Sequence, residues 1–288
     1  MDVFQALFHP AGRGTISDWI ARAVWTSVRA AAKRYPGVIT YAGPVAFVCV
    51  IGSWIVLVVI GPALIFWPQM TAAFVPAPGL EPGKHSGFFD ALNTSLGSLT
   101  NVSTELHAKE KWVRLLMNLE GIVGFGLLTA SVSWLLSLYP VLGSKRSLAQ
   151  QASLLHWAEI ENDVDLFSVP ASESVPVLMS LTAQLTTLRS QVIQLPITYY
   201  FHVGEEEGAL AGILPYLAEL AVRSTRAGRP ASLRLAGTSL GGAVDSYLEM
   251  IATIFLRIPT DDKGAILRRH ADDQLRRMVV GRAGRRAA

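Results

Sequence analysis

The chain has 288 residues, of which 51% are hydrophobic and only 16% are charged, and its formal net charge is +3. A soluble globular domain usually carries about 25% charged residues, so this composition argues against an ordinary soluble protein. The small net charge does not indicate a nucleic-acid partner, and the single cysteine excludes a disulfide within the chain and a multi-cysteine metal site.

Residues 1–36 precede the first long apolar run and contain an amphipathic segment. Asp18, Arg22 and Arg29 share one helical face, and apolar side chains recur on another. These apolar side chains are Ile16, Trp19, Ile20, Val24 and Val28. We expect a helix that lies in the membrane interface or packs against the cytoplasmic part of the chain; the pattern fits both equally.

Two long apolar runs follow. Gly37 to Trp67 contains no acidic, basic or histidine residue, and Trp112 to Leu142 contains only Arg114 and Glu120. A helix that crosses about 30 Å of hydrocarbon needs roughly 20 apolar residues, so each run predicts one transmembrane helix. Lys and Arg are more frequent before the first run and after the second than between them. The positive-inside rule therefore places both termini in the cytoplasm.

Between the runs, within residues 86–106, Asp90, Ala91 and Leu92 open a segment that is rich in small and hydroxylic side chains. On composition alone an ordinary extracellular loop is favoured. A short helix that enters the membrane and returns as irregular chain is possible only where it is buried in protein or lines water.

The sequence motifs here favour that second possibility. The order of span, short segment and span resembles the two-transmembrane bacterial potassium channel family. Asp90, Ala91, Leu92 and Ser95 match the pore-helix pattern D-A-L-Y-F-S, and Ser98-Leu99-Thr100 stands where that family has T-L-T. In the second run, LEGIVGFGLLTASVSWL (residues 119–135) is similar to the family's inner helix, with matches at Glu120, Gly121, Gly124 and Gly126.

The resemblance implies a homotetramer in the bacterial inner membrane. The predicted fold is an all-α membrane protein with two transmembrane helices and a re-entrant pore helix in residues 37–142. A mostly helical cytoplasmic domain is expected in residues 143–288, with membrane lipids as further partners.

The filter departs from the family pattern. Aligned without a gap, T-V-G-Y-G-D becomes Asn101-Val102-Ser103-Thr104-Glu105-Leu106. Ser103 and Glu105 replace glycines whose backbone angles cost other residues about 1 kcal/mol or more. We therefore do not expect a potassium-selective filter of the usual geometry.

Two functions remain open. Around a fourfold axis, Glu105 would form a carboxylate ring that attracts cations, with Thr100, Asn101, Val102, Ser103 and Thr104 completing a hydrated, weakly selective pore for K⁺ or Na⁺. The alternative is a non-conducting channel-fold protein with a sensory or scaffold role through its cytoplasmic domain. The resemblance also suggests that Glu120 supports the pore helix. Gly124 and Gly126 would serve either as a hinge in the inner helix or as sites of close helix packing.

The cytoplasmic region shows helical periodicity in five segments: 147–160, 172–195, 208–226, 239–256 and 262–280. Gly237 to Gly241 matches the G-x-S-x-G elbow of hydrolases, but no strand and helix alternation precedes it, so we interpret Ser239 as a helix N-cap and expect no enzyme. The six histidines lack metal-ligand spacing, and no cofactor or metal is expected. The sequence does not indicate a cytoplasmic ligand.

Overall fold

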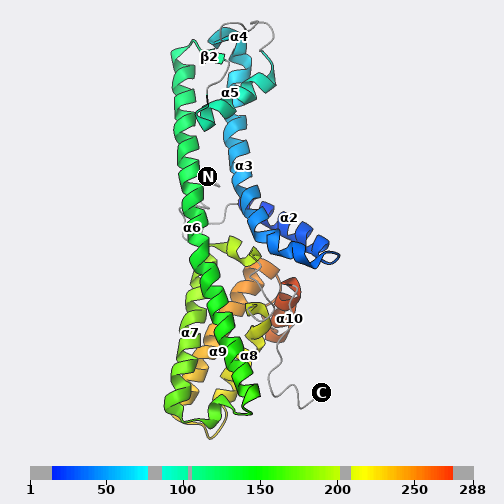
Figure 1. Ribbon diagram of the computed structural model, residues 1–288, viewed down its shortest axis with the longest axis vertical. Helices are drawn as coiled ribbons and strands as arrows, with labels where there is room; N and C mark the ends of the chain where they lie inside the picture. Colours follow the sequence, from blue (N-terminus) through cyan, green and yellow to red (C-terminus); the bar gives the residue numbers. More distant parts are fainter. Residues whose placement is uncertain (1–14, 77–85, 103–105, 202–208, 275–288) are drawn as a thin grey trace. The chain divides into compact units, whose positions relative to one another are not determined.

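The computed structural model describes residues 15–76, 86–102, 106–201 and 209–274. These residues are mostly helical, as predicted (Figure 1). They form two compact units: unit 1 takes in Met1–Val24 and Pro44–Ser137, and unit 2 takes in Trp25–Gly43 and Leu138–Ala288. The predicted boundaries at 36/37 and 142/143 stay a prediction.

Among the described residues, two helical segments, Gly37–Ala73 and Lys111–Glu161, are long and apolar enough to cross a membrane, in agreement with the two apolar runs of the sequence. The first takes in all but the first residue of η1 (Pro36–Tyr41) and all of α3 (Ala42–Phe66), and the second is α6 (Lys111–Glu161). Only 22% of the most apolar stretch of each is buried within the chain, whereas a core helix of a soluble protein is mostly buried.

The chain between these helices is partly irregular. After α3 come η2 (Trp67–Gln69), α4 (Met70–Ala73) and β1 (Phe74–Pro76), followed by α5 (Phe88–Thr100) and β2 (Leu106–Ala108). β1 and β2 pair antiparallel, with Val75 opposite His107. This short ladder is not part of the predicted all-α fold; it joins two segments that flank α5 and covers a cluster of Phe66, Met70 and Val113.

α6 is one continuous helix. The sequence predicts a break between Leu142 and Ser147, but the helix passes through Pro140 without ending. A proline removes one N–H donor from the helical ladder rather than every bond around it. The missing donor is the one that would meet the Leu136 carbonyl, four residues earlier. The Pro140 carbonyl still accepts a hydrogen bond, from the Ser144 hydroxyl (2.9 Å).

Unit 2 is a helical bundle. The end of α6 leads through η4 (Leu166–Ser168) to α7 (Ala171–Gln194) and η5 (Pro196–Tyr200). Then follow α8 (Leu210–Ser224), α9 (Ala231–Ile251), the π-helical η7 (Ala252–Leu256) and α10 (Lys263–Asp273). α9 packs against both α7 and α8. The three- and four-residue spacing of Leu181, Leu185 and Leu188 on α7 places fully buried leucines along one stripe.

A buried ion network joins α6 to α8. Arg223 Nη2 lies 2.9 Å from Glu159 Oε1 and 2.6 Å from Asp165 Oδ1. The Tyr216 hydroxyl donates to the other Glu159 oxygen (2.9 Å). Burial works against the charge of Asp165, but the N–H of Phe167 and the Arg223 guanidinium prevail and hold the pKa of Asp165 below its usual value.

The amphipathic helix α2 (Thr15–Ala32) contributes its second half to unit 2. Trp25 is buried and lies edge-on to Tyr199 at 6.2 Å, and Arg29 pairs with Asp273 at 3.0 Å. For these residues the structure shows packing against the chain's own second unit. Trp19, in the first half of α2, is 72% exposed.

The G-x-S-x-G motif lies in the middle of α9, so the interpretation of Ser239 as an N-cap is wrong. The helix begins at Ala231, and the Ser239 hydroxyl donates to the Leu235 carbonyl one turn earlier (3.1 Å). A Cβ added at Gly237 would overlap the Ser224 side chain of α8. The motif is therefore a helix-crossing point rather than a strand-to-helix elbow.

Candidate functional site

The candidate site in unit 1 centres on α5, the short helix between the two apolar helices. Its N-terminus is capped because the Gly87 N–H donates to the Asp90 carboxylate (2.9 Å). Its C-terminus ends at Asn101, which is left-handed (φ 55°), and the Val102 N–H returns to the Gly97 carbonyl (2.9 Å). This closure is the usual way a helix satisfies its last carbonyls.

A buried polar node attaches α5 to both long helices. The Ser95 hydroxyl lies within hydrogen-bonding distance of the Val59 carbonyl on α3 (2.8 Å) and of the Glu120 carboxyl on α6. Ser95 is 0% exposed and Glu120 is 4% exposed. A buried polar group is stable only when it has partners, so this node fixes the position of α5 between the two helices. Glu120 thus contacts the helix that the sequence analysis assigned it to support.

Glycines bring the end of α5 close to α6. A Cβ at Gly124 would overlap the Leu99 carbonyl, and a Cβ at Gly121 would lie 2.8 Å from Asn101 Oδ1. A Cβ at Gly126 would have no heavy atom of another element within 4 Å. Within one chain, Gly124 is therefore a site of close packing, and the hinge role of Gly124 and Gly126 stays a prediction.

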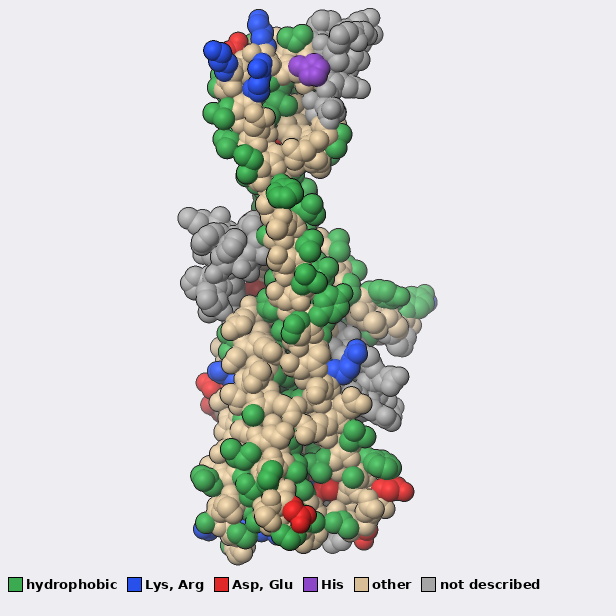
Figure 2. Space-filling model, turned by 60° about the vertical axis from the view of Figure 1, so that its left-hand side comes forward, with side chains coloured by type: hydrophobic (Ala, Val, Ile, Leu, Met, Phe, Trp, Pro, Cys, Tyr) green, Lys and Arg blue, Asp and Glu red, His purple; other side chains and the backbone are tan. Residues whose placement is uncertain are grey.

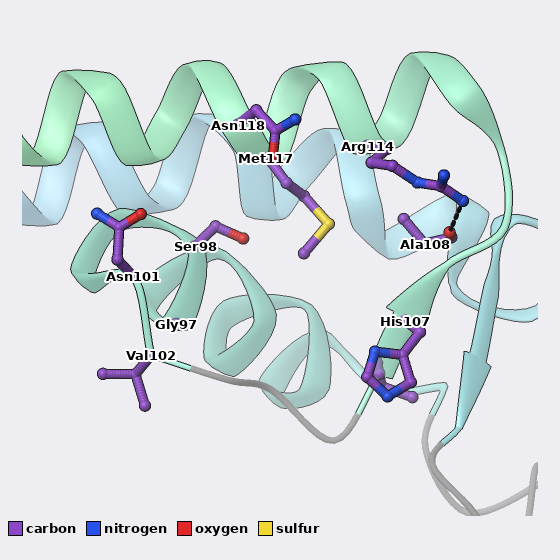
Figure 3. Close-up of a pocket in the computed structure, with 10 residues that line it drawn as sticks. Gly97, Ser98, Asn101, Val102, His107, Ala108, Arg114, Met117 and Asn118 are labelled. Carbon is purple, nitrogen blue, oxygen red and sulfur yellow. Dashed lines mark hydrogen bonds between the residues drawn. The ribbon is translucent and has the colours of Figure 1, made fainter.

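A cavity of about 420 Å³ lies beside the end of α5. Figure 3 shows it between α5, β2 and the start of α6, with Ser98 and Asn101 from α5 and Met117 and Asn118 from α6 drawn at its wall. Arg114 donates to the Ala108 carbonyl at its rim (3.1 Å). None of the described lining residues is a carboxylate.

The predicted filter residues fall into two groups. Thr100 is the last residue of α5, and its hydroxyl donates to the Leu96 carbonyl (2.8 Å). Asn101 ends the helix, and Val102 is 63% exposed. Ser103, Thr104 and Glu105 lie outside the described residues. The structure therefore brings Asn101 next to Gly121 of α6, and the carboxylate ring stays a prediction.

The sequence analysis missed a polar stripe on α6. Gly126, Thr129, Ser133 and Ser137 are all exposed and follow one another at spacings of three and four residues. The face that packs against the rest of unit 1 contains Glu120 and Leu127 and lies on another side of the helix, because a turn takes 3.6 residues. The sequence does contain a sign of this stripe, because hydroxyl side chains recur at helical spacing in an otherwise apolar run. It does not show which face of the helix other parts of the chain pack against.

No group of three or more histidine, cysteine, aspartate or glutamate side chains in the described ranges is placed to hold a metal ion. Comparison of the chain with known protein families, with characterised proteins and with solved structures found no match.

Proposed function

We propose that this chain is a multi-pass protein of the bacterial inner membrane, with both termini in the cytoplasm, that assembles as a tetramer around a weakly selective cation pore. The proposal combines the resemblance to two-transmembrane potassium channels with the geometry of unit 1. The single observation that carries it is the stripe of Thr129, Ser133 and Ser137 on the exposed face of α6.

Hydroxyl groups facing hydrocarbon gain nothing from that contact, and polar residues in spanning helices usually face protein or a water-filled cavity. If this exposed side of α6 faces a fourfold axis, the stripes of four chains meet around it. They would then line a narrow hydroxylic path, and α5, fixed by Ser95 and Glu120, would direct the chain after Thr100 toward the entrance of this path.

One observation favours the alternative, a non-conducting scaffold or sensor. The Thr129 hydroxyl donates to the Phe125 carbonyl and the Ser137 hydroxyl donates to the Ser133 carbonyl, each at 2.9 Å, so both donors are satisfied without water. Together with Gly126 they form the kind of small-residue stripe along which spanning helices pack closely.

Ion flux through purified protein in liposomes distinguishes the two functions. We expect flux of K⁺ and Na⁺ that Glu105→Gln weakens or reorders and that Ser133→Leu abolishes. Val132→Leu is the matched control, because Val132 is exposed on the neighbouring helix position but outside the stripe. Absence of flux from folded tetramers would reject the conducting pore and favour the scaffold. Equal flux from both leucine variants would reject the stripe on α6 as the lining of the pore.

A further inference from the structure

One side of unit 2 carries no charge over a long stretch. We define the α6/α7 face by the exposed residues Gln150, Leu154 and Trp157 of α6 and Met179 and Ala183 of α7. Leu154 is 56% exposed, Trp157 60% and Met179 48%. Gln151 and Gln184, which are hydrogen-bonded to each other, join the two helices.

The absence of charge on this face is unusual. Within the described stretches 147–158 and 174–188 there is no aspartate, glutamate, lysine or arginine. Figure 2 turns the α6 and α7 side forward and shows mostly hydrophobic and uncharged side chains across this part of unit 2. A water-exposed surface usually carries about 25–35% charged residues, whereas the centre of a protein interface is depleted of charge and enriched in Trp and Met.

The spacing on α6 is that of a helix that packs against another helix. Its exposed positions include Ser147, Gln150, Leu154, Trp157 and Glu161, which follow one another in steps of three and four residues. This 3.5-residue repeat keeps one seam of a helix facing a partner over several turns. Leu154 and Trp157 lie at its centre.

We propose that the α6/α7 face is the contact by which unit 2 of one copy of this chain packs against unit 2 of a second copy. The inference rests on the proposed tetramer and adds to it a cytoplasmic interface centred on Leu154 and Trp157. Chains already assembled through their spans would hold these faces at a high effective concentration, so a contact too weak for free monomers would form.

Charge at one end of the bundle fits a second copy. Glu161 at the end of α6 and Glu173 at the start of α7 are exposed, as are Arg226 and Arg234 at the turn from α8 to α9. The Arg223–Glu159 ion pair brings the ends of α6 and α8 together, so these charges share one end of the bundle. Copies related by rotation about an axis parallel to α6 have these charged groups at the same position along that axis. The acidic groups of one copy therefore lie at the same level as the basic groups of the next.

A lipid surface is a poorer fit. A helix that lies on a membrane usually places Lys and Arg on its polar side to attract anionic headgroups. Between Ser147 and Ala158, α6 has neither. A lipid contact would also not depend on the heptad-like spacing of the exposed positions.

Disulfide cross-linking of full-length protein in membranes tests the inference. In a Cys49→Ser background, single variants Leu154→Cys and Trp157→Cys are oxidised beside Leu235→Cys, a control that is 70% exposed on α9. Ser133→Cys reports on the proposed pore axis. We expect covalent dimers at 154 and 157 about tenfold faster than at 235, as short-tether effective concentrations imply.

The outcomes separate the two proposals. If the cysteine at 133 cross-links while those at 154 and 157 cross-link no faster than the control at 235, the α6/α7 interface is overturned. The tetrameric pore is then still supported. Cross-linking at 154 and 157 without ion flux would support the interface and reject the pore. Loss of cross-linking at all four positions would reject both.

Discussion

The two units distribute polar and apolar groups in opposite ways. In unit 1, α3 and α6 expose Val48, Leu64 and Phe125 while Ser95 and Glu120 are buried. In unit 2, the leucines of α7 and α8 and most of those of α9 are buried, and most charged groups lie at the surface apart from the Glu159–Arg223 pair. Both units are helical, so secondary structure does not distinguish them. This difference is the one expected if hydrocarbon surrounds the apolar helices of the first unit, as we propose, and water surrounds the second unit.

The largest expected effect tests whether α3 of unit 1 is surrounded by hydrocarbon. Cys49 is the only cysteine and is exposed on α3. In intact membranes we expect a water-soluble maleimide to leave Cys49 unlabelled, because the reaction needs a hydrated thiolate. Labelling should become complete after unfolding in SDS. Leu235→Cys in a Cys49→Ser background is the control for a water-exposed thiol in opened membranes. Equal labelling rates at the two positions would contradict the membrane placement.

Loss of the buried ion network should lower the free energy of unfolding of unit 2 and leave that of unit 1 unchanged. Arg223→Met leaves Glu159 buried without its guanidinium partner, and loss of one partner of a buried pair costs about 3–5 kcal/mol. Chemical denaturation monitored by circular dichroism in detergent should show this loss in the unfolding of unit 2.

Arg226→Met is the matched control, since Arg226 is exposed and a surface change is usually within about 0.5 kcal/mol. A similar free energy of unfolding for both variants would show that the network adds nothing to unit 2.

Acid should also destabilise unit 2 through His270. Burial, aided by the positive charge of Lys145, lowers the pKa of His270 to about 3. In the unfolded chain His270 binds its proton near pH 6.5, whereas in the folded chain it stays neutral until about pH 3. The free energy of unfolding therefore decreases as pH falls from 6.5 toward 3, by up to about 1.4 kcal/mol per pH unit.

His270→Phe keeps a ring beside Tyr199, which stacks on His270 at 5.8 Å. Comparing its denaturation with that of the parent chain between pH 6.5 and 4.5 should show a shallower pH dependence. Parallel curves would mean that His270 is protonated in the folded state.

The smallest effect separates two glycines of α6. Gly124→Ala forces a methyl group into the Leu99 carbonyl, and such overpacking costs about 1–3 kcal/mol. Gly126→Ala meets open space, so stability should hold or rise slightly because alanine favours helices. Thermal unfolding in detergent measures both. A loss of stability in Gly126→Ala would point to a neighbouring chain packed against that position.

Several features could be predicted from residue pattern because they depend on local chemistry. The uncharged runs before Trp67 and Leu142 indicate long apolar helices, since hydrocarbon tolerates few charges. The helix from Phe88 follows from the match of Asp90, Ala91, Leu92 and Ser95 to a pore helix. The helices of unit 2 follow from apolar residues at 3.6-residue spacing.

Other features could not be predicted from the residue pattern. The sequence analysis interpreted Gly237 to Gly241 as a turn before a helix capped by Ser239, but Gly237 lies inside α9, where it allows the close crossing of α9 and α8 at Ser224. The sequence suggested a break after Leu142, but α6 continues to Glu161. Backbone propensities are small beside tertiary packing, and packing decided both cases.

The order of residues was enough to predict two helices able to cross a membrane and a mostly helical remainder, and the resemblance to a pore helix predicted the short helix between the two. Only the tertiary structure decided that Glu120 meets Ser95, that Trp25 packs on Tyr199, and that Thr129 and Ser133 stay uncovered on α6. Hydrophobicity and capping act over a few neighbouring residues, whereas burial depends on which distant helix packs against each face, and no local pattern encodes that packing.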